Sequence, residues 1–464
     1  MKIRLFIATV AAKLAVWGLR LIKSGGTTLP GKIALKIYPN IGVELAKNFN
    51  IIMVTGTNGK TTTTKIISKI FEKNDIKYVT NKSGANLVGG IITTLIEAVS
   101  VTGKSPSSTA LLEIDEAAFN KITHYIKPHM LVVTNFFRDQ LDRYGELYTT
   151  LNGVKEGLKR CPDTKLVLNA DDSLCASIGN EAENSAFYFG FESTSYAGKP
   201  ETTSSDAMFC IYCKEKYTYQ SHVYGHLGTF ECPGCGYKKP ATNLSCVSVD
   251  KLSTSSSEIT YSVMEETGIQ SYSANINLPG VYNIYNGLAA ASCATLLKLP
   301  ADNTLRALSS FESGFGRMET IEAEGKTIKL ILVKNPTGFN QVLNFLATEE
   351  KNMSIAFVIN DNLADGTDIS WLWDVDFEML TELKDRVNVF YTSGVRGEDM
   401  SVRLKYAGIP TDKVNLCHDY NELLSQGLAS IEDGCNLYIL PTYTSMLDIR
   451  GILANKYGLK EFWK

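Results

Sequence analysis

Residues 53–65 read MVTGTNGKTTTTK, and no other segment limits the fold of this chain as strongly. Glycine, lysine and threonine in succession, between an apolar run and a helical pattern, are typical of a loop that binds phosphate after a β-strand. The usual loop carries a further glycine where this chain has Val54, so Gly56 would have to make the close approach to phosphate. A threonine- and glycine-rich loop without a ligand is the alternative.

The residue types of this loop suit a nucleoside triphosphate bound together with Mg²⁺. Lys60 would reach the β- and γ-phosphates, and the Thr61 hydroxyl would bind the metal. Glu113, Asp115 and Glu116 follow another apolar run, where parallel sheets gather their ligands, and Glu113 is the expected second ligand of Mg²⁺. The helix dipole would also explain acidic residues at a helix start. The residues expected to bind the nucleotide are Gly56, Thr57, Asn58, Gly59, Lys60, Thr61 and Thr62.

Two C-x₂-C pairs, at residues 210–213 and 232–235, are separated by eighteen residues. Two such pairs can close a tetrahedral site around one structural zinc ion. Two disulfides are the alternative, but they are disfavoured in a reducing compartment. His222 and His226 lie between the pairs and could replace a cysteine as ligand. The expected zinc ligands are Cys210, Cys213, Cys232 and Cys235.

Short apolar runs alternate with helical patterns along most of the chain, which predicts an α/β fold with mostly parallel sheets covered on both faces. The runs that predict strands are 50–56, 109–115, 129–136, 164–172, 327–333, 353–361, 387–394 and 435–443. Residues 193–260 are rich in Ser, Thr, Tyr and Gly, and they predict an excursion from the sheet. The expected parts are an N-terminal helical segment (1–45), a central domain (46–315) with a zinc ribbon insertion (205–240), and a C-terminal Rossmann-like α/β domain (316–464).

Near the start of the chain, residues 3–22 are apolar but interrupted by Arg4, Lys13 and Arg20. The longest uncharged run, 5–12, is too short to span a bilayer. We expect an amphipathic or buried helix, with a signal peptide or a helix on the membrane surface as alternatives. No transmembrane segment and no long basic run occur, and the net charge is −3, so a cytoplasmic protein that does not bind nucleic acid is predicted.

Six segments occur in the order found in the Mur ligase superfamily, which this chain therefore resembles. They are TGTNGKTTT, EIDEA, TNFFRDQLDRYGE, LNADD, GVYNIYNGLAAA and GFGRMET. Members of the superfamily use ATP to convert a carboxylate into an acyl phosphate, which an amine then attacks. The resemblance implies a P-loop central domain and the cofactors ATP and Mg²⁺. It also implies that Asn286 contacts the adenine and that Arg317 lies near the phosphates.

The chain also departs from the superfamily. Only about fifty residues precede the phosphate loop, which leaves no room for the usual uridine-nucleotide domain and argues against a soluble nucleotide-linked substrate. Gln140 stands where the ligases have a metal-binding histidine, which questions a second Mg²⁺ site. Lys155 is at the position of a carbamylated lysine or is an ordinary surface lysine. Residues 331–336 lack the acid that binds the ribose.

Within the superfamily, the four-cysteine ribbon and the segment ADGTDISWLWDVDFE (364–378) resemble the MurT family, the synthetase subunits of lipid II isoglutaminyl synthase. The resemblance implies amidation of the α-carboxylate of D-glutamate in the lipid II stem peptide, at the inner face of the membrane. The ammonia would come from a GatD-type class I glutaminase, whose catalytic triad Asp368 would complete. Chemistry alone does not separate Asp368 from Asp361 and Asp365, and an aspartate that only caps a turn is the alternative.

The expected catalytic residues are accordingly Asp368, Lys60 and Glu113. An amino-acid-adding ligase of the Mur or folylpolyglutamate type is the second hypothesis, and it needs no partner. A non-enzymatic zinc ribbon scaffold is the third, and the phosphate loop argues against it.

Overall fold

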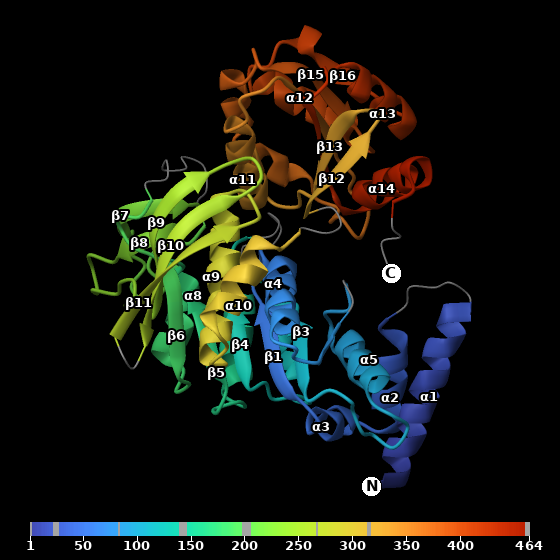
Figure 1. The fold of residues 1–464 in the computed structure, drawn as a ribbon, viewed down its shortest axis with the longest axis vertical. Coiled ribbons are helices and arrows are strands. Elements are labelled where there is room, and N and C mark those ends of the chain that lie inside the picture. The colour runs from blue at the N-terminus through green and yellow to red at the C-terminus, as the bar shows by residue number, and fades with distance from the viewer. Residues whose placement is uncertain are drawn as a thin grey trace.

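The computed structural model describes most of the chain as two α/β domains preceded by helices (Figure 1). The described residues are 2–21, 27–81, 84–138, 146–196, 206–265, 268–312 and 317–459. The N-terminal helices are α1 (Lys2–Leu21), α2 (Leu29–Ile37) and α3 (Ile41–Ala46).

The central domain is built on a nine-stranded sheet. Its strands are β1 (Asn50–Thr55), β2 (Tyr78–Thr80), β3 (Thr109–Glu113), β4 (Met130–Val133), β5 (Lys165–Asn169), β6 (Ala186–Phe191), β9 (Leu244–Leu252), β10 (Ser257–Glu265) and β11 (Gly268–Ile276), in the order β11-β10-β9-β6-β5-β4-β1-β3-β2. Its helices are α4 (Lys60–Lys73), α5 (Val88–Ala98), α6 (Phe119–Ile122), α7 (Glu146–Leu158), α8 (Ser173–Glu181), α9 (Val281–Leu296) and α10 (Ala301–Ser309). Because the chain crosses over β1 between β3 and β4, the strand order reverses there, and a ligand crevice is expected beyond the carboxyl end of β1.

Helices cover both faces of this sheet, so its strands have to be apolar on both sides. In β1, Ile52 and Val54 face the core formed with α4, α9 and α10, whereas Ile51 and Met53 face the core formed with α1, α2 and α5. The continuous apolar run that predicted this strand therefore reflects burial on alternating sides.

The segment 193–260 does not leave the sheet as a whole, contrary to the prediction from its composition. β9 pairs in parallel with β6, and β10 pairs in antiparallel orientation with β9 and β11. Only the stretch before β9 departs, and it carries the separate hairpin of β7 (Thr218–Tyr224) and β8 (Leu227–Glu231). The strands were missed because their alternating polar residues face solvent at the sheet edge, a pattern that composition does not separate from a loop.

The C-terminal domain contains a six-stranded sheet with the order β12-β13-β17-β14-β15-β16. The strands are β12 (Arg317–Ala323), β13 (Lys326–Ile331), β14 (Met353–Val358), β15 (Val387–Ser393), β16 (Val414–Leu416) and β17 (Asn436–Pro441). The helices are α11 (Pro336–Ala347), α12 (Gly397–Tyr406), α13 (Tyr420–Ala429) and α14 (Tyr443–Tyr457), with short 3₁₀ helices η2 (Ser370–Asp374), η3 (Phe377–Glu382) and η4 (Thr411–Lys413). All eight runs that predicted strands form strands in one of the two sheets.

Candidate nucleotide site and metal centre

The phosphate loop follows β1 and needs glycine at two positions. Gly56 has φ +124°, and a Cβ atom there would lie 2.3 Å from Thr134 Oγ1. Gly59 has φ +83°, and a Cβ atom there would lie 2.1 Å from Asn286 Oδ1. A side chain at either position would be strained and would clash, so the conformation of the loop requires glycine at both.

The loop after β4 holds the phosphate loop in place. Thr57 donates its backbone N–H to Asn135 O at 2.9 Å, and its hydroxyl donates to Phe137 O at 3.1 Å. The Asn58 N–H donates to Asn135 Oδ1 at 2.9 Å. The segment TNFFR was recognised in the sequence only as a family motif, and the structure gives it a physical task as the support of the phosphate loop.

Lys60 lies across the loop at the start of α4. Its Nζ forms a 2.8 Å ion pair with Glu116 Oε2 and donates to the carbonyl oxygens of Gly56 and Thr57. Both side chains of the ion pair are largely buried, with exposures of 11% and 13%. Glu116 was noted in the sequence as one of three acidic residues, but its pairing with Lys60 was not predicted.

The expected magnesium ligands lie at the same edge of the sheet. Thr61 is buried in the first turn of α4, and Glu113 ends β3 directly beside Val54 of β1. The backbone of Glu113 is fixed by Asn81, which accepts the Glu113 N–H at 2.8 Å. A hydroxyl and a carboxylate at this edge are oxygen donors of the kind that Mg²⁺ prefers.

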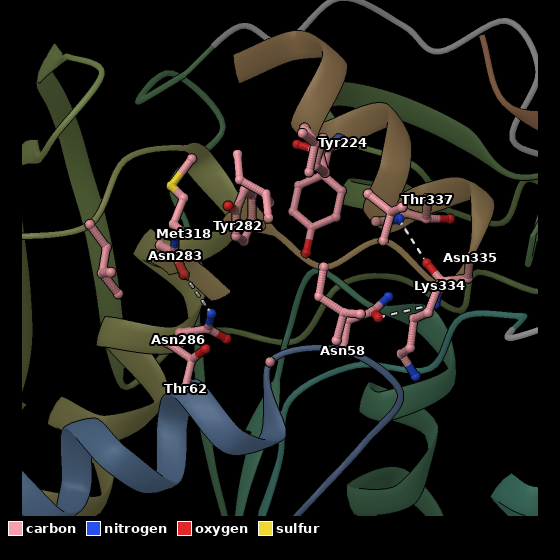
Figure 2. A pocket seen from close by; sticks show the side chains of 18 residues that line it. Asn58, Thr62, Tyr224, Tyr282, Asn283, Asn286, Met318, Lys334, Asn335 and Thr337 are labelled. Atoms are coloured by element: carbon pink, nitrogen blue, oxygen red, sulfur yellow. Dashed lines mark hydrogen bonds between the residues drawn. The ribbon is translucent and has the colours of Figure 1, made fainter. Parts of the chain in front are cut away.

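A pocket opens between the phosphate loop and the C-terminal domain (Figure 2). Its labelled side chains are Asn58, Thr62, Tyr224, Tyr282, Asn283, Asn286, Met318, Lys334, Asn335 and Thr337. Asn286 is held at the phosphate loop, because it donates to Asn283 Oδ1 at 3.0 Å and accepts from the Thr63 hydroxyl at 3.3 Å. The residue expected at the adenine thus lines a pocket that begins at the phosphate loop.

Asn335 lines this pocket on the side of the C-terminal domain. It was not predicted from the sequence as a site residue. Its Nδ2 donates to Asn58 Oδ1 at 3.1 Å across the two domains, and its Oδ1 accepts the Gly338 N–H at 2.8 Å. An asparagine followed by Pro336 is a typical helix N-terminus, so the sequence did contain a signal for the helix cap. The bridge to Asn58 depends on how the domains meet.

The remaining residues predicted from the family resemblance lie outside the described residues or away from the pocket. Arg317 begins β12, and its side chain lies outside the described part of the structure, as does Gln140. Lys155 forms a 2.7 Å ion pair with Glu181 at the end of α8. Burial lowers the pKa of Lys155, and the neighbouring Glu181 opposes that shift.

The four predicted zinc ligands come together. All four sulfur atoms lie within 4.8 Å of one another, with 3.6 Å between Cys210 and Cys235 and 3.3 Å between Cys213 and Cys232. Tetrahedral Zn–S bonds of about 2.3 Å place sulfurs about 3.8 Å apart, so the cluster fits zinc. Burial opposes ionisation of Cys210, but N–H groups of Cys213 and Tyr212 lower its pKa to about 6. Neither histidine joins this cluster among the described residues.

The hairpin of the ribbon docks beside the support of the phosphate loop. His226, at its tip, lies 3.2 Å from Asp172 Oδ1 and packs against the Phe137 ring at 4.6 Å. The same Asp172 caps α8 and accepts the Phe136 N–H at 2.6 Å. The carbonyl oxygen of Phe137 also accepts the Thr57 hydroxyl. Phe137 therefore contacts both the hairpin of the ribbon and the phosphate loop.

The three aspartates of the C-terminal motif are held differently. Asp361 pairs with Arg396 at 2.6 Å, and Asp365 accepts the Thr444 N–H at 2.7 Å. Asp368 accepts both the N–H and the hydroxyl of Ser370, each at 2.8 Å, at the start of η2. Asp361 and Asp365 thus tie their loop to neighbouring elements, whereas these bonds hold Asp368 within its own turn.

Two family descriptions match the chain. Residues 54–229 match the Mur ligase middle domain, and residues 332–446 match the MurT ligase C-terminal domain. The chain is 36% identical to the lipid II isoglutaminyl synthase (glutamine-hydrolyzing) subunit MurT of Streptococcus pneumoniae, over 93% of each chain. It is 31% identical to the same subunit of Staphylococcus aureus, over 88% of this chain and 89% of the relative.

Solved structures share the fold at low identity. A pseudomurein peptide ligase type C from Methanothermus fervidus matches with a TM-score of 0.63 at 20% identity, over 88% of this chain and 79% of that one. MurF from Thermotoga maritima, solved in complex with ADP, matches with a TM-score of 0.61 at 13% identity, over 91% and 84%.

The fold, the phosphate loop and the middle-domain match together define a protein of the Mur ligase class. Within that class, the chain belongs to the MurT family. The resemblance seen in the motifs and the predicted fold class are thereby confirmed. Among the described residues, no helix has the length and apolar character needed to cross a bilayer.

Proposed function

We propose that this chain is the synthetase subunit of a lipid II isoglutaminyl synthase. It would use ATP to amidate the α-carboxylate of D-glutamate in the stem peptide, at the cytoplasmic face of the membrane. The observation that best supports this proposal is the Gly59-Lys60-Thr61 phosphate loop in a chain that is similar to MurT over nearly its whole length.

The reaction would proceed through an acyl phosphate. A carboxylate oxygen of the substrate attacks the γ-phosphorus of ATP, and ADP leaves. Ammonia then attacks the acyl carbon, the C–O bond to phosphate breaks, and the amide forms with loss of a proton. Mg²⁺, held by Thr61 and Glu113, would offset the charge of the phosphates, and Lys60 would do so at the transferring group.

The Lys60–Glu116 ion pair suggests how the site is arranged before a nucleotide binds. Without a nucleotide, Glu116 supplies the negative charge that Lys60 needs in a largely buried position. The phosphates of ATP would provide that charge instead, so Lys60 would exchange a carboxylate for a phosphate oxygen rather than lose a partner.

The ammonia would come from a partner glutaminase, with Asp368 orienting the histidine of the partner's triad. The Ser370 bonds fix the Asp368 carboxylate in one orientation, which a positioning residue requires. The zinc ion would be structural, because four thiolates leave no open coordination position.

The test is mass spectrometry of lipid II after incubation with this chain, ATP, Mg²⁺ and glutamine, with and without a glutaminase subunit. A hydroxyl replaced by an amide only when the subunit is present supports the proposal. Asp368→Asn should abolish the reaction with glutamine and retain the reaction with added ammonia. Asp361→Asn is the matched variant, and it should retain both if Asp368 alone serves the partner.

An amino-acid-adding ligase is the second candidate, since the solved relatives of this fold include peptide ligases. It predicts ATP turnover without any partner and with an amino acid as the nucleophile. Unchanged lipid II together with ATP turnover in the presence of an amino acid would replace the proposed function by this one.

A further inference from the structure

Helix α1 carries an exposed apolar stripe along its whole length. The spacing of three and four residues places these side chains on one face. The members and their exposed fractions are Ile3 76%, Ile7 49%, Leu14 61%, Trp17 63% and Leu21 63%, with Phe6 at 49% beside them. Single exposed apolar residues are ordinary, but a continuous stripe marks an interaction surface.

The opposite face of α1 is committed to the fold. Ala8 and Ala12 are fully buried, and they belong to the core shared with α2 and α5. Figure 1 shows α1 at the edge of the molecule, with α2 and α5 between it and the large sheet. The stripe therefore points away from the protein.

Cations border the stripe on both sides. Residues 2–21 contain no aspartate or glutamate, and Arg4 lies along one side of the stripe while Lys13 and Arg20 lie along the other. The carboxylate that meets these cations from another element is Glu97 of α5, which pairs with Arg20. Burial lowers the pKa of Lys13, and Glu97 opposes that shift. The border is thus cationic overall.

We propose that α1 lies flat on an anionic lipid bilayer, with the stripe in the boundary between headgroups and acyl chains and the cations at the phosphates. An apolar face with a basic border and no acid is the pattern of an interfacial helix. A second copy of α1 is disfavoured as occupant, because its own cations would face those of the first copy. The inference concerns lipid binding and does not depend on the ligase reaction.

The experiment is co-sedimentation of the full chain with vesicles of phosphatidylglycerol and phosphatidylcholine, compared with phosphatidylcholine alone. The wild type should bind the anionic vesicles, and binding should weaken with salt. The double variant Leu14→Glu with Trp17→Glu should bind about tenfold less or worse. Leu363→Glu, a charge at an exposed leucine of the C-terminal domain, is the matched control and should bind like the wild type.

Fluorescence gives an independent readout of the same contact. Emission should shift to the blue when anionic vesicles are added, and Trp17→Phe should remove that shift while vesicle binding is retained. Wild-type protein that does not sediment, or a double variant that sediments equally, overturns the proposal. So does a double variant that, without lipid, changes the oligomeric state or loses a glutaminase partner, because the stripe then covers a protein.

Discussion

The pocket beside the phosphate loop has two walls, each built from a strand, a loop and a helix, and the walls differ at the N-terminal ends of the two helices. In the central domain, β1 leads through a loop into α4, and in the C-terminal domain β13 leads into α11. The N-cap residue of α4 is Gly59, and no side chain caps this helix. The N-cap residue of α11 is Asn335, whose side chain caps the helix, and Pro336 removes a further N–H donor. The central wall therefore offers a helix N-terminus without a side-chain cap, which suits an anion.

This difference supports an orientation for the nucleotide of the proposed function. In that orientation the phosphates would lie at α4, beside Gly59 and Lys60. The other end of the nucleotide would lie toward α11, against a wall of apolar and amide side chains that includes Met318 and Gln341. The Asn58–Asn335 bond joins the walls, so the pocket is complete only while the two domains are in contact.

The largest difference between the two walls is expected when one lysine is removed from each of them. Lys60→Ala should lower ATP turnover by about 10²–10³-fold, because the transferring group loses its positive partner. Lys334→Ala, on the opposite wall, should change turnover by less than about tenfold, since no capped helix end binds phosphate there. Steady-state kinetics of both variants decide this, and equal losses would refute the assignment of the phosphates to the central wall.

Removing one of the four expected metal ligands tests whether the stability of the central domain depends on the zinc ribbon. Cys213→Ser should lose bound zinc and lower the melting temperature by roughly 5 °C or more, since a structural site contributes folding energy. Metal analysis and thermal unfolding provide the measurements. The control is Cys435→Ser, a cysteine outside the cluster, which should keep its zinc. Full thermal stability without zinc would show that the hairpin docks unaided.

Loss of the Asn58–Asn335 hydrogen bond between the walls should have a smaller effect. Asn335→Ala loses the cap of α11 and the bond to Asn58, so the KM for ATP should rise by roughly fivefold. The loss of the cap should also cost about 1 kcal/mol of unfolding free energy. Asn335→Asp separates these effects, because it keeps an acceptor for the cap and loses the donor to Asn58. A KM that changes only in the alanine variant would mean that the bridge is dispensable.

The smallest effect is expected from a change at Glu116, and it concerns the affinity for ADP. In buffer without Mg²⁺, Glu116→Gln should tighten ADP binding by roughly two- to fivefold, because Lys60 no longer has a competing carboxylate. Isothermal titration calorimetry measures this directly, and Asp115→Asn is the matched neighbouring variant. Weaker ADP binding only when Mg²⁺ is present would instead make Glu116 a metal ligand.

Much of the fold and part of the site could be predicted from the sequence. The eight strands followed from apolar runs, and the cysteine cluster followed from spacing alone. β10 and β11 could not be predicted, because one side of each strand faces solvent and its composition resembles a loop. The Lys60–Glu116 pair and the contact of His226 with Phe137 join segments that lie more than fifty residues apart. No local pattern encodes such contacts.

The sequence by itself determined the phosphate loop, the two cysteine knuckles and the alternation of strands and helices. These features depend on backbone geometry and on side chains within a few residues of one another. Only the tertiary structure decided which carboxylate meets Lys60, which amide closes the pocket and which face of α1 stays exposed. Those outcomes depend on strand order and on the packing of whole domains, since the partners meet only after the two sheets have formed.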